Sequence, residues 1–251
     1  MLVAGHRGYP EKYPENTLIS FMSAIDTGVD MIELDIQMTL DNELIIMHNK
    51  DVDKTTNGTG LVKDMTLAEI RSLDAGSWFG KRFLGEKVPL FTEFLELTKN
   101  RKELLFDFEL KEYPVPGNEE RAYRTADMAT ALAEEYDLAD RLVFNAFSAD
   151  LLQYIHEKYE GRYALHGYYP SNLLGESSRD PYSFLHCACV CGELAPAPFE
   201  MLRSRNIEPW VGTSVNTEEK IRQAREYGAA LITCDNPAEI LGILRRLGLH
   251  S

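Results

Sequence analysis

The chain has 251 residues, and 44% of them are hydrophobic, which suits one large packed domain. Its formal net charge of −14 argues against a nucleic-acid surface, which would need clustered lysine and arginine. No apolar run approaches the about 18 residues of a membrane span, and the N-terminus resembles no signal peptide, so we expect no stable membrane anchor.

Short apolar runs alternate along the chain with amphipathic stretches of helical length. The first expected helix starts at Asn16, a possible N-cap, and ends before Gly28, which suits a left-handed C′ position. The expected strands are Leu2–Gly5, Met31–Gln37, Glu43–Met47, Leu104–Leu110, Arg141–Ala146, Tyr163–Gly167, Leu185–Cys191, Pro209–Val215 and Ala230–Thr233. The expected helices are Asn16–Thr27, Glu119–Tyr136, Ala149–Lys158, Phe199–Asn206, Glu218–Tyr227 and Ala238–Leu247.

Repeated strand–helix units of this size predict an α/β fold in which a parallel sheet has helices outside it. Their number favours a TIM-type (β/α)8 barrel formed by a single domain over residues 1–251. One connection departs from the pattern, because only 38–42 separates two strands, too few residues for a parallel crossover. We therefore expect an antiparallel hairpin there. If its turn centres on Asp41 and Asn42, His48 lies opposite Asp35.

The segment at about 50–89 has few regular strands and many turn-forming residues. It is too long for an ordinary loop, and we interpret it as a small inserted subdomain of short helices over one mouth of the barrel. Thr66 and Glu69 have the spacing of a capping box. Trp78, Phe79 and Phe83 either pack this insertion or line a substrate entrance, and packing is the more favoured of the two.

Four cysteines occur, and the first three alternate along an expected strand. Alternation places Cys187, Cys189 and Cys191 on one face, without the paired spacing of a zinc site. We interpret them and Cys234 as small buried hydrophobic residues of a reduced cytoplasmic protein.

Two acidic residues share one face of an expected strand. Glu33 and Asp35 are two residues apart, and inside a barrel their charges need a cation or a proton to be tolerated. Carboxylate oxygens favour a hard divalent cation, Mg²⁺ or Ca²⁺, over zinc. Considered alone, such a pair more often belongs to a half-exposed edge strand with solvated acids than to a functional site.

A second acidic strand favours the metal interpretation. The run from Phe106 to Lys111 alternates apolar and charged residues, so Asp107, Glu109 and Lys111 share one face. Glu109 falls near the carboxyl end of its strand, where barrels build active sites, and is a candidate third metal ligand. Lys111 could reach a phosphate oxygen, and Asp107 receives no role.

Two histidines follow short apolar runs. His6 comes directly after the first expected strand, beside Arg7, whose planar guanidinium suits a phosphate diester. His48 follows the third expected strand. The other histidines receive the default interpretation of structural or surface residues; they are His156, His166, His186 and His250.

Seven short motifs follow one another along the chain. The chain contains HRG at 6–8, PENT at 14–17, ELD at 33–35, HN at 48–49, TTNG at 55–58, ELK at 109–111 and ITCDNP at 232–237. In this combination it resembles the glycerophosphodiester phosphodiesterases over essentially its whole length. The resemblance implies a TIM-type barrel with a small insertion after the second histidine.

The resemblance also implies roles for individual residues. Glu33, Asp35 and Glu109 match the ligands of one divalent cation, His6 and His48 match the general acid/base pair, Arg7 and Lys111 match phosphate-contacting residues, and Glu15 and Asn16 match positions that support the site. Two positions depart from the pattern. Asn49 stands where an aspartate is common, and Thr213 stands where an aromatic residue is usual before the late strand's end, with Trp210 nearby.

The predicted function is hydrolysis of a small glycerophosphodiester to an alcohol and glycerol 3-phosphate. The resemblance implies that a substrate hydroxyl attacks first and forms a cyclic phosphate, which water then opens. Two alternatives stay open: a lysophospholipase D-type enzyme whose acyl channel uses Trp78, Phe79, Phe83 and Leu84, and a catalytically silent barrel that binds phosphodiesters. Head group, metal, histidine roles and oligomeric state are not determined at this level.

Overall fold

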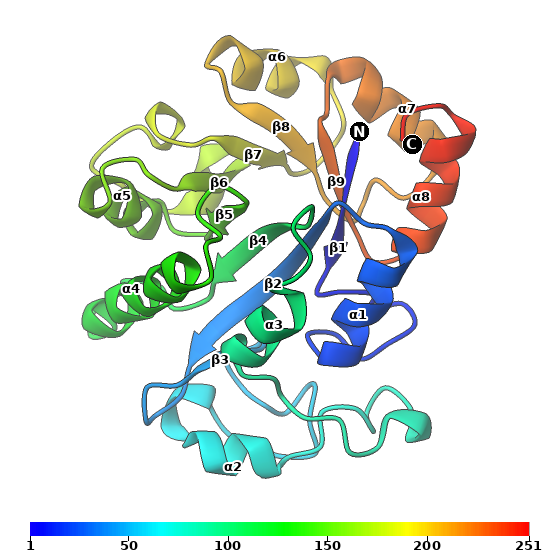
Figure 1. The fold of residues 1–251 in the computed structure, drawn as a ribbon. Helices are drawn as coiled ribbons and strands as arrows, with labels where there is room; N and C mark the ends of the chain where they lie inside the picture. Colours follow the sequence, from blue (N-terminus) through cyan, green and yellow to red (C-terminus); the bar gives the residue numbers. More distant parts are fainter. Residues whose placement is uncertain (251) are drawn as a thin grey trace.

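Eight parallel strands close into a barrel in the computed structural model, which describes residues 1–250 (Figure 1). The ring closes because β1 pairs with both β9 and β2. The predicted TIM-type barrel is therefore confirmed. In ring order the strands are β1 (Leu2–His6), β9 (Leu231–Cys234), β8 (Glu208–Val211), β7 (Cys187–Val190), β6 (Ala164–Tyr169), β5 (Leu142–Asn145), β4 (Leu105–Leu110) and β2 (Met31–Met38).

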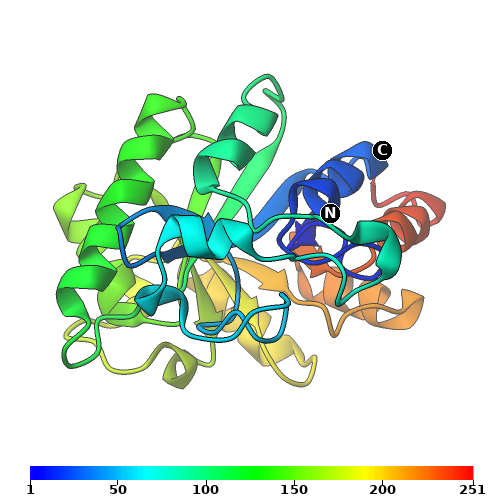
Figure 2. The same ribbon diagram turned by 90° about the horizontal axis from the view of Figure 1, so that it is seen from below.

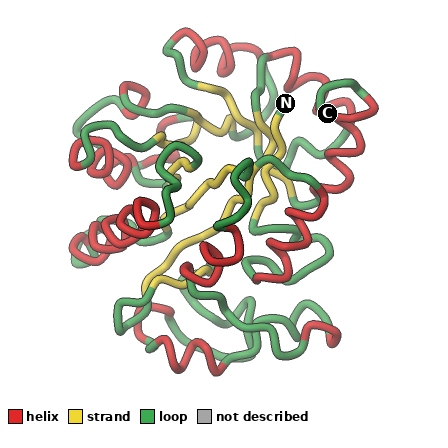
Figure 3. The backbone as a smooth tube through the Cα atoms, viewed as in Figure 1, coloured by secondary structure: helices red, strands yellow, loops and turns green. Residues whose placement is uncertain are grey.

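Helices form an outer layer around the strands (Figure 3). They are α1 (Leu18–Thr27), α2 (Leu67–Ser72), α3 (Phe91–Thr98), α4 (Glu119–Glu135), α5 (Ala149–Lys158), α6 (Pro196–Ser204), α7 (Glu218–Tyr227) and α8 (Pro237–Arg246). Short 3₁₀ turns are η1 (Val62–Asp64), η2 (Lys81–Phe83), η3 (Ser171–Leu174) and η4 (Pro181–Ser183). Helix α6 begins at Pro196 rather than at Phe199, because a proline in the first turn loses no helical hydrogen bond.

The start of α1 also differs from the prediction. Thr17, not Asn16, is the N-cap, and its side chain accepts a hydrogen bond from the Ser20 amide. Asn16 has a positive φ of 56°, and its Nδ2 donates to Asp35 Oδ2 at 2.7 Å. Gly28 ends the helix in the left-handed conformation, as predicted.

Strand β3 (Leu44–Ile46) forms the predicted antiparallel hairpin with β2. The register pairs Ile36 with Ile46, and the Met47 amide donates to the Asp35 carbonyl at 2.9 Å. Met47 therefore lies opposite Asp35, and the prediction that His48 would do so is wrong by one residue. The reason is the turn, which closes at Thr39–Glu43 and centres on Asp41 alone.

The segment between β3 and α3 holds η1, α2 and η2, and it packs with Ile45 of β3 into a small hydrophobic cluster. That cluster contains Ile45, Met47, Val52, Val62, Ile70, Ala75 and Val88. The predicted capping box at Thr66 and Glu69 is present at the start of α2. Figure 2 shows the segment from its own side of the molecule.

Aromatic side chains join this segment to the loop that follows β1. Phe83 is buried, and its ring centroid lies 5.7 Å from that of Tyr13 and 5.5 Å from that of Phe79. Arg82 Nη2 donates to the Lys12 carbonyl at 3.0 Å. The favoured interpretation of these aromatics as packing residues is thus confirmed for Phe83, while Trp78 remains 40% exposed.

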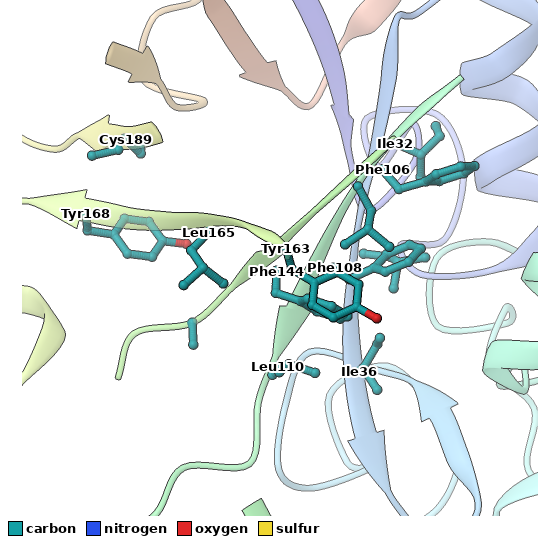
Figure 4. Packing of buried hydrophobic residues seen from close by; sticks show 14 of the residues in the cluster. Ile32, Ile36, Phe106, Phe108, Leu110, Phe144, Tyr163, Leu165, Tyr168 and Cys189 are labelled. Carbon is teal, nitrogen blue, oxygen red and sulfur yellow. The ribbon is translucent and has the colours of Figure 1, made fainter. Parts of the chain in front are cut away.

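The alternation of β4 separates two environments. Its phenylalanines point outward and pack on α3, where Phe94 lies 5.8 Å from Phe106 and 6.4 Å from Phe108 between ring centroids. Figure 4 shows Phe106 and Phe108 among buried residues of the neighbouring strands, including Ile32 and Ile36. Asp107 and Glu109 point the other way, into the barrel. An apolar layer fills the opposite end of the barrel interior and contains Ala4, Met31, Val143, Cys187, Trp210 and Leu231.

Candidate active site

Three buried carboxylates meet where β2 and β4 lie side by side. Asp35 pairs in register with Glu109, and Glu33 lies two residues before Asp35 on the same face. One ligand oxygen from each of the three lies within 4.8 Å of the others. Oxygen ligands at this spacing suit a hard divalent cation, so the cluster could hold a metal ion.

Two cations border this acidic cluster. Lys111 Nζ lies 2.5 Å from Glu109 Oε1 and 3.6 Å from Asp35 Oδ1. Arg7 Nε lies 3.4 Å from Asp35 Oδ2, and Arg7 Nη1 donates to Glu15 Oε1 at 2.8 Å. Glu15 therefore orients Arg7 and Asn16 restrains Asp35, which explains how the PENT motif supports the site.

The charges of the three acids respond differently to their surroundings. Burial raises the pKa of Glu33 well above its usual range, and the Asp35 and Glu109 carboxylates raise it further. Burial and Asp35 also raise the pKa of Glu109. Burial acts in the same direction on Asp35, but Lys111 and Arg7 outweigh it and lower that pKa overall. A bound divalent cation would relieve the repulsion between these groups.

The predicted histidines border one cavity, and each has a different partner. His6, at the end of β1, lies 2.6 Å from Asp235 Oδ1 through its Nδ1. His48 lies 2.8 Å from Asn49 Oδ1 through its Nδ1. Burial lowers the pKa of His48, although Asp35 opposes the change. One ring therefore faces a carboxylate and the other a neutral amide.

The cavity has a volume of about 260 Å³ and opens at the carboxyl ends of the strands. His6, Arg7, Glu33, His48 and Glu109 line it. Asp35 and Lys111 lie behind this lining, in contact with Arg7 and Glu109. The structure thus brings all seven residues of the sequence prediction to one place.

Other residues in or beside the cavity were missed or misinterpreted from the sequence. Asp235 contacts His6 without lining the cavity, and Asp107 lines it, but the sequence prediction gives neither a role. His166 was given the default interpretation of a structural or surface histidine, whereas it is buried and lines the cavity. The signal that could have found it is its place on an inward face near a strand's carboxyl end. The remaining lining residues are Asn145, Phe147, Tyr168, Cys189, Gly212, Thr213 and Thr233.

Aromatic residues reach the cavity from a different element than expected. Trp210 lies in the apolar layer at the opposite end of the barrel, and Thr213 lines the cavity in place of the usual aromatic. Phe147 and Tyr168 supply an aromatic wall instead, with ring centroids 3.6 Å apart and an interplanar angle of 16°. The aromatics of the 50–89 segment are not among the lining residues, which come from the described chain.

The prediction of buried cysteines is confirmed for three of the four and is wrong for Cys191, which is half-buried. Within residues 1–250 all four are free, and Cys187, Cys189 and Cys234 are buried.

Among the described helices, none is both long and apolar enough to cross a membrane.

Three buried acids that could hold a divalent cation, two basic side chains and two histidines thus meet at the carboxyl ends of the strands of a parallel barrel, where such barrels build active sites. Residues 6–239 match the model of the glycerophosphoryl diester phosphodiesterase family. The chain belongs to this family.

Curated relatives share the family name. The chain is 42% identical over 149 residues, 59% of its length, to a glycerophosphodiester phosphodiesterase of Caldanaerobacter subterraneus subsp. tengcongensis, and the match covers 58% of that protein. It is 45% identical over 114 residues, 45% of its length, to a putative glycerophosphodiester phosphodiesterase of Bacillus subtilis, covering 46% of it. The chain therefore matches roughly half the length of these relatives.

A solved structure shares the fold over nearly the whole of both chains. A phosphodiesterase of Oleispira antarctica, solved in complex with the product sn-glycerol-3-phosphate, has a TM-score of 0.81 and 22% identity, covering 98% of this chain and 97% of that one. A putative glycerophosphoryl diester phosphodiesterase of Silicibacter pomeroyi has a TM-score of 0.84 and 24% identity, covering 100% and 95%. At these identities the likeness establishes the barrel.

Proposed function

We propose that this protein hydrolyses glycerophosphodiesters to an alcohol and glycerol 3-phosphate. The observation that carries the proposal is the buried triad Glu33, Asp35 and Glu109, bordered by two cations and two histidines around one cavity. Curated relatives bear the name of this activity, and a structural neighbour holds sn-glycerol-3-phosphate.

The proposed cofactor is one Mg²⁺ or Ca²⁺ ion. Glu33, Asp35 and Glu109 would hold it, since all three offer oxygen ligands and Asp35 Oδ1 accepts no hydrogen bond from the described residues. When bound, the ion would draw charge from the phosphoryl oxygens. Arg7 would bind the same phosphate through its planar guanidinium, and Lys111 would bind it through its compact ammonium charge.

The two histidines have different partners, which supports different roles. Asn49 Oδ1 accepts from His48 Nδ1–H, so Nε2 of this ring is free to take the proton of the attacking oxygen. Its lowered pKa favours the neutral form that a base requires. Asp235 Oδ1 accepts a hydrogen bond from His6 Nδ1–H and orients the ring, so His6 Nε2 would be the atom that gives a proton to the leaving alkoxide.

The activity is tested with a panel of glycerophosphodiesters assayed after EDTA dialysis and after addition of each metal. We expect glycerol 3-phosphate to form only when Mg²⁺ or Ca²⁺ is present. Full activity in the stripped protein would exclude the metal, and absence of turnover on every diester would exclude the reaction.

The same panel decides between head-group classes. The lysophospholipid alternative depended on aromatic residues at about 50–89, and these do not line the described cavity. We therefore expect glycerophosphocholine to be cleaved faster than lysophosphatidylcholine. A reversed order would favour the lysophospholipase D-type activity.

We further propose one phosphodiesterase domain over residues 1–251 with an insertion at about 50–89, acting on small molecules rather than nucleic acid in the cytoplasm. Five of the seven residues of a separate hydrophobic cluster lie between Val52 and Val88, which supports the insertion. The free cysteines suit a reducing compartment. The net charge of −14 supports the absence of nucleic-acid binding.

A further inference from the structure

The β4–β6 side of the cavity carries three polar residues that have no part in the reaction proposed above. Asn145 on β5 pairs in register with His166 on β6, and Asp107 lies on β4. Their exposed fractions are 2%, 3% and 0%, and all three residues line the cavity. Burying three polar side chains inside a barrel is unfavourable unless their polar atoms form hydrogen bonds or ion pairs.

The pairing is incomplete within residues 1–250. Asp107 Oδ1, Asn145 Oδ1 and His166 Nε2 are buried atoms without a hydrogen-bond partner there. Unpaired buried polar atoms are rare in folded proteins, and three of them around one cavity indicate a ligand that supplies the missing bonds.

Asp107 holds the His166 ring in one orientation. His166 Nδ1 lies 2.8 Å from Asp107 Oδ2, and because a carboxylate only accepts, Nδ1 carries the hydrogen. The ring also packs against Trp210 and Tyr168, with centroids 4.6 Å and 5.3 Å away. Nε2 is therefore the one ring nitrogen left for a ligand.

We propose that His166, positioned by Asp107 and assisted by Asn145, binds hydroxyl groups of the substrate's polyol portion. A hydroxyl group both donates and accepts, so it matches the two oxygen acceptors and the imidazole nitrogen. The stacked rings of Phe147 and Tyr168 provide an apolar wall for the carbon chain that bears these hydroxyls. This inference rests on the proposed function and adds a specificity determinant to it.

A quaternary ammonium group fits these residues less well. It has no N–H or O–H to donate to Asp107 Oδ1 or Asn145 Oδ1, which would remain unpaired. Phe147 and Tyr168 lie almost parallel, so each covers one face of the other and reduces the surface for a cation.

The test uses a double variant, Asp107→Leu/His166→Phe, because removal of one partner would leave a buried group stranded. Replacing both members of a buried pair with apolar residues of similar volume is often neutral for stability. Asn145→Ala provides an independent second variant. His186→Gln is the matched control, since His186 is exposed and outside the cavity.

Dissociation constants are measured by calorimetry for glycerol 3-phosphate, methyl phosphate and phosphocholine, with saturating Mg²⁺. All three ligands share a phosphate, only the first carries free hydroxyls, and only the third carries a quaternary ammonium group. We expect the wild type and H186Q to prefer glycerol 3-phosphate about tenfold or more, a preference that falls to about twofold in the double variant and declines in N145A. The dissociation constant for methyl phosphate should stay within about threefold of the wild-type value in every variant.

Three results would overturn the proposal. If the double variant still prefers glycerol 3-phosphate over methyl phosphate as strongly as the wild type, His166 does not determine specificity. The proposal that the protein hydrolyses glycerophosphodiesters would not be affected by this result. Loss of phosphocholine affinity with unchanged glycerol 3-phosphate affinity assigns the same residues to an ammonium group. If the wild type hydrolyses no glycerophosphodiester and binds neither phosphate, the proposed function fails together with the subsite.

Discussion

At the residue scale, Asp35 joins the most distant parts of the site. Asn16 donates to its Oδ2, Arg7 lies beside the same oxygen, and Lys111 approaches Oδ1. These partners come from the loop after β1 and the end of β4. A fully buried carboxylate tolerates this position because opposite charges and a hydrogen bond offset the loss of solvation.

His6→Ala and His48→Ala should each lower kcat about 100-fold or more, because each removes one proton transfer. The fold should be unaffected, since neither side chain belongs to a hydrophobic cluster. Steady-state kinetics and circular dichroism check the two effects. Near-wild-type turnover in either purified variant would exclude that residue from the mechanism.

Asn49→Asp should shift the acidic limb of the plot of kcat/KM against pH to a higher pH, by about one unit. A carboxylate at His48 Nδ1 favours the imidazolium form and raises its pKa, so the base is lost at a higher pH. Asn100→Asp, an exposed position, is the control. An unmoved limb in N49D would contradict the role of His48 as base.

At the element scale, strand β4 connects the core to the site. Its outward phenylalanines pack on α3, while its inward carboxylates face the cavity. The alternation of the strand therefore determines both the core contacts and the cavity lining. The hairpin β2–β3 shows the limit of local inference. The turn residues predict that a hairpin forms, but a one-residue difference in the turn shifts the register, which depends on pairing across the whole ladder.

Phe94→Ala should lower the free energy of unfolding by about 3–5 kcal/mol, because it opens a cavity between aromatic rings. Phe94 is fully buried against Phe21, Phe106 and Phe108. Urea unfolding measures the change. Val115→Ala, which is 52% exposed, should change it by less than about 0.5 kcal/mol. A similar loss in both variants would contradict this account of the core.

At the scale of the whole molecule, the acidic cluster couples metal binding to stability. An acid whose pKa is raised by folding stabilises the protein at low pH, and the contribution disappears as the pH rises through that pKa. Glu33 and Glu109 therefore destabilise the metal-free protein as the pH rises above 4.5, the ordinary pKa of a glutamate. Asp35, with a lowered pKa, contributes stability that is lost only as the pH falls.

A divalent cation should consequently raise Tm more at pH 8 than at pH 5, because it binds the ionised carboxylates. At a hundredfold excess over Kd the stabilisation should be about 2.7 kcal/mol. Thermal denaturation with EDTA or with Mg²⁺ measures it. The Glu33→Gln/Glu109→Gln variant should lose the gain, and a gain that persists there would place the ion elsewhere.

By itself, the sequence determined the strand–helix alternation, the barrel and the shared face of Glu33 and Asp35. These features follow from local periodicity and from a distinctive order of motifs. It also indicated which seven residues to consider for the site, although their catalytic roles remain predictions.

Only the tertiary structure decided which side chains from distant strands meet. Asp235 reaches His6 across 229 positions of sequence, and Asp107 reaches His166 across 59. Neither contact can be predicted from the periodicity of the sequence. Closure of the ring brings β1 beside β9, and it places the inward faces of β4 and β6 around one cavity.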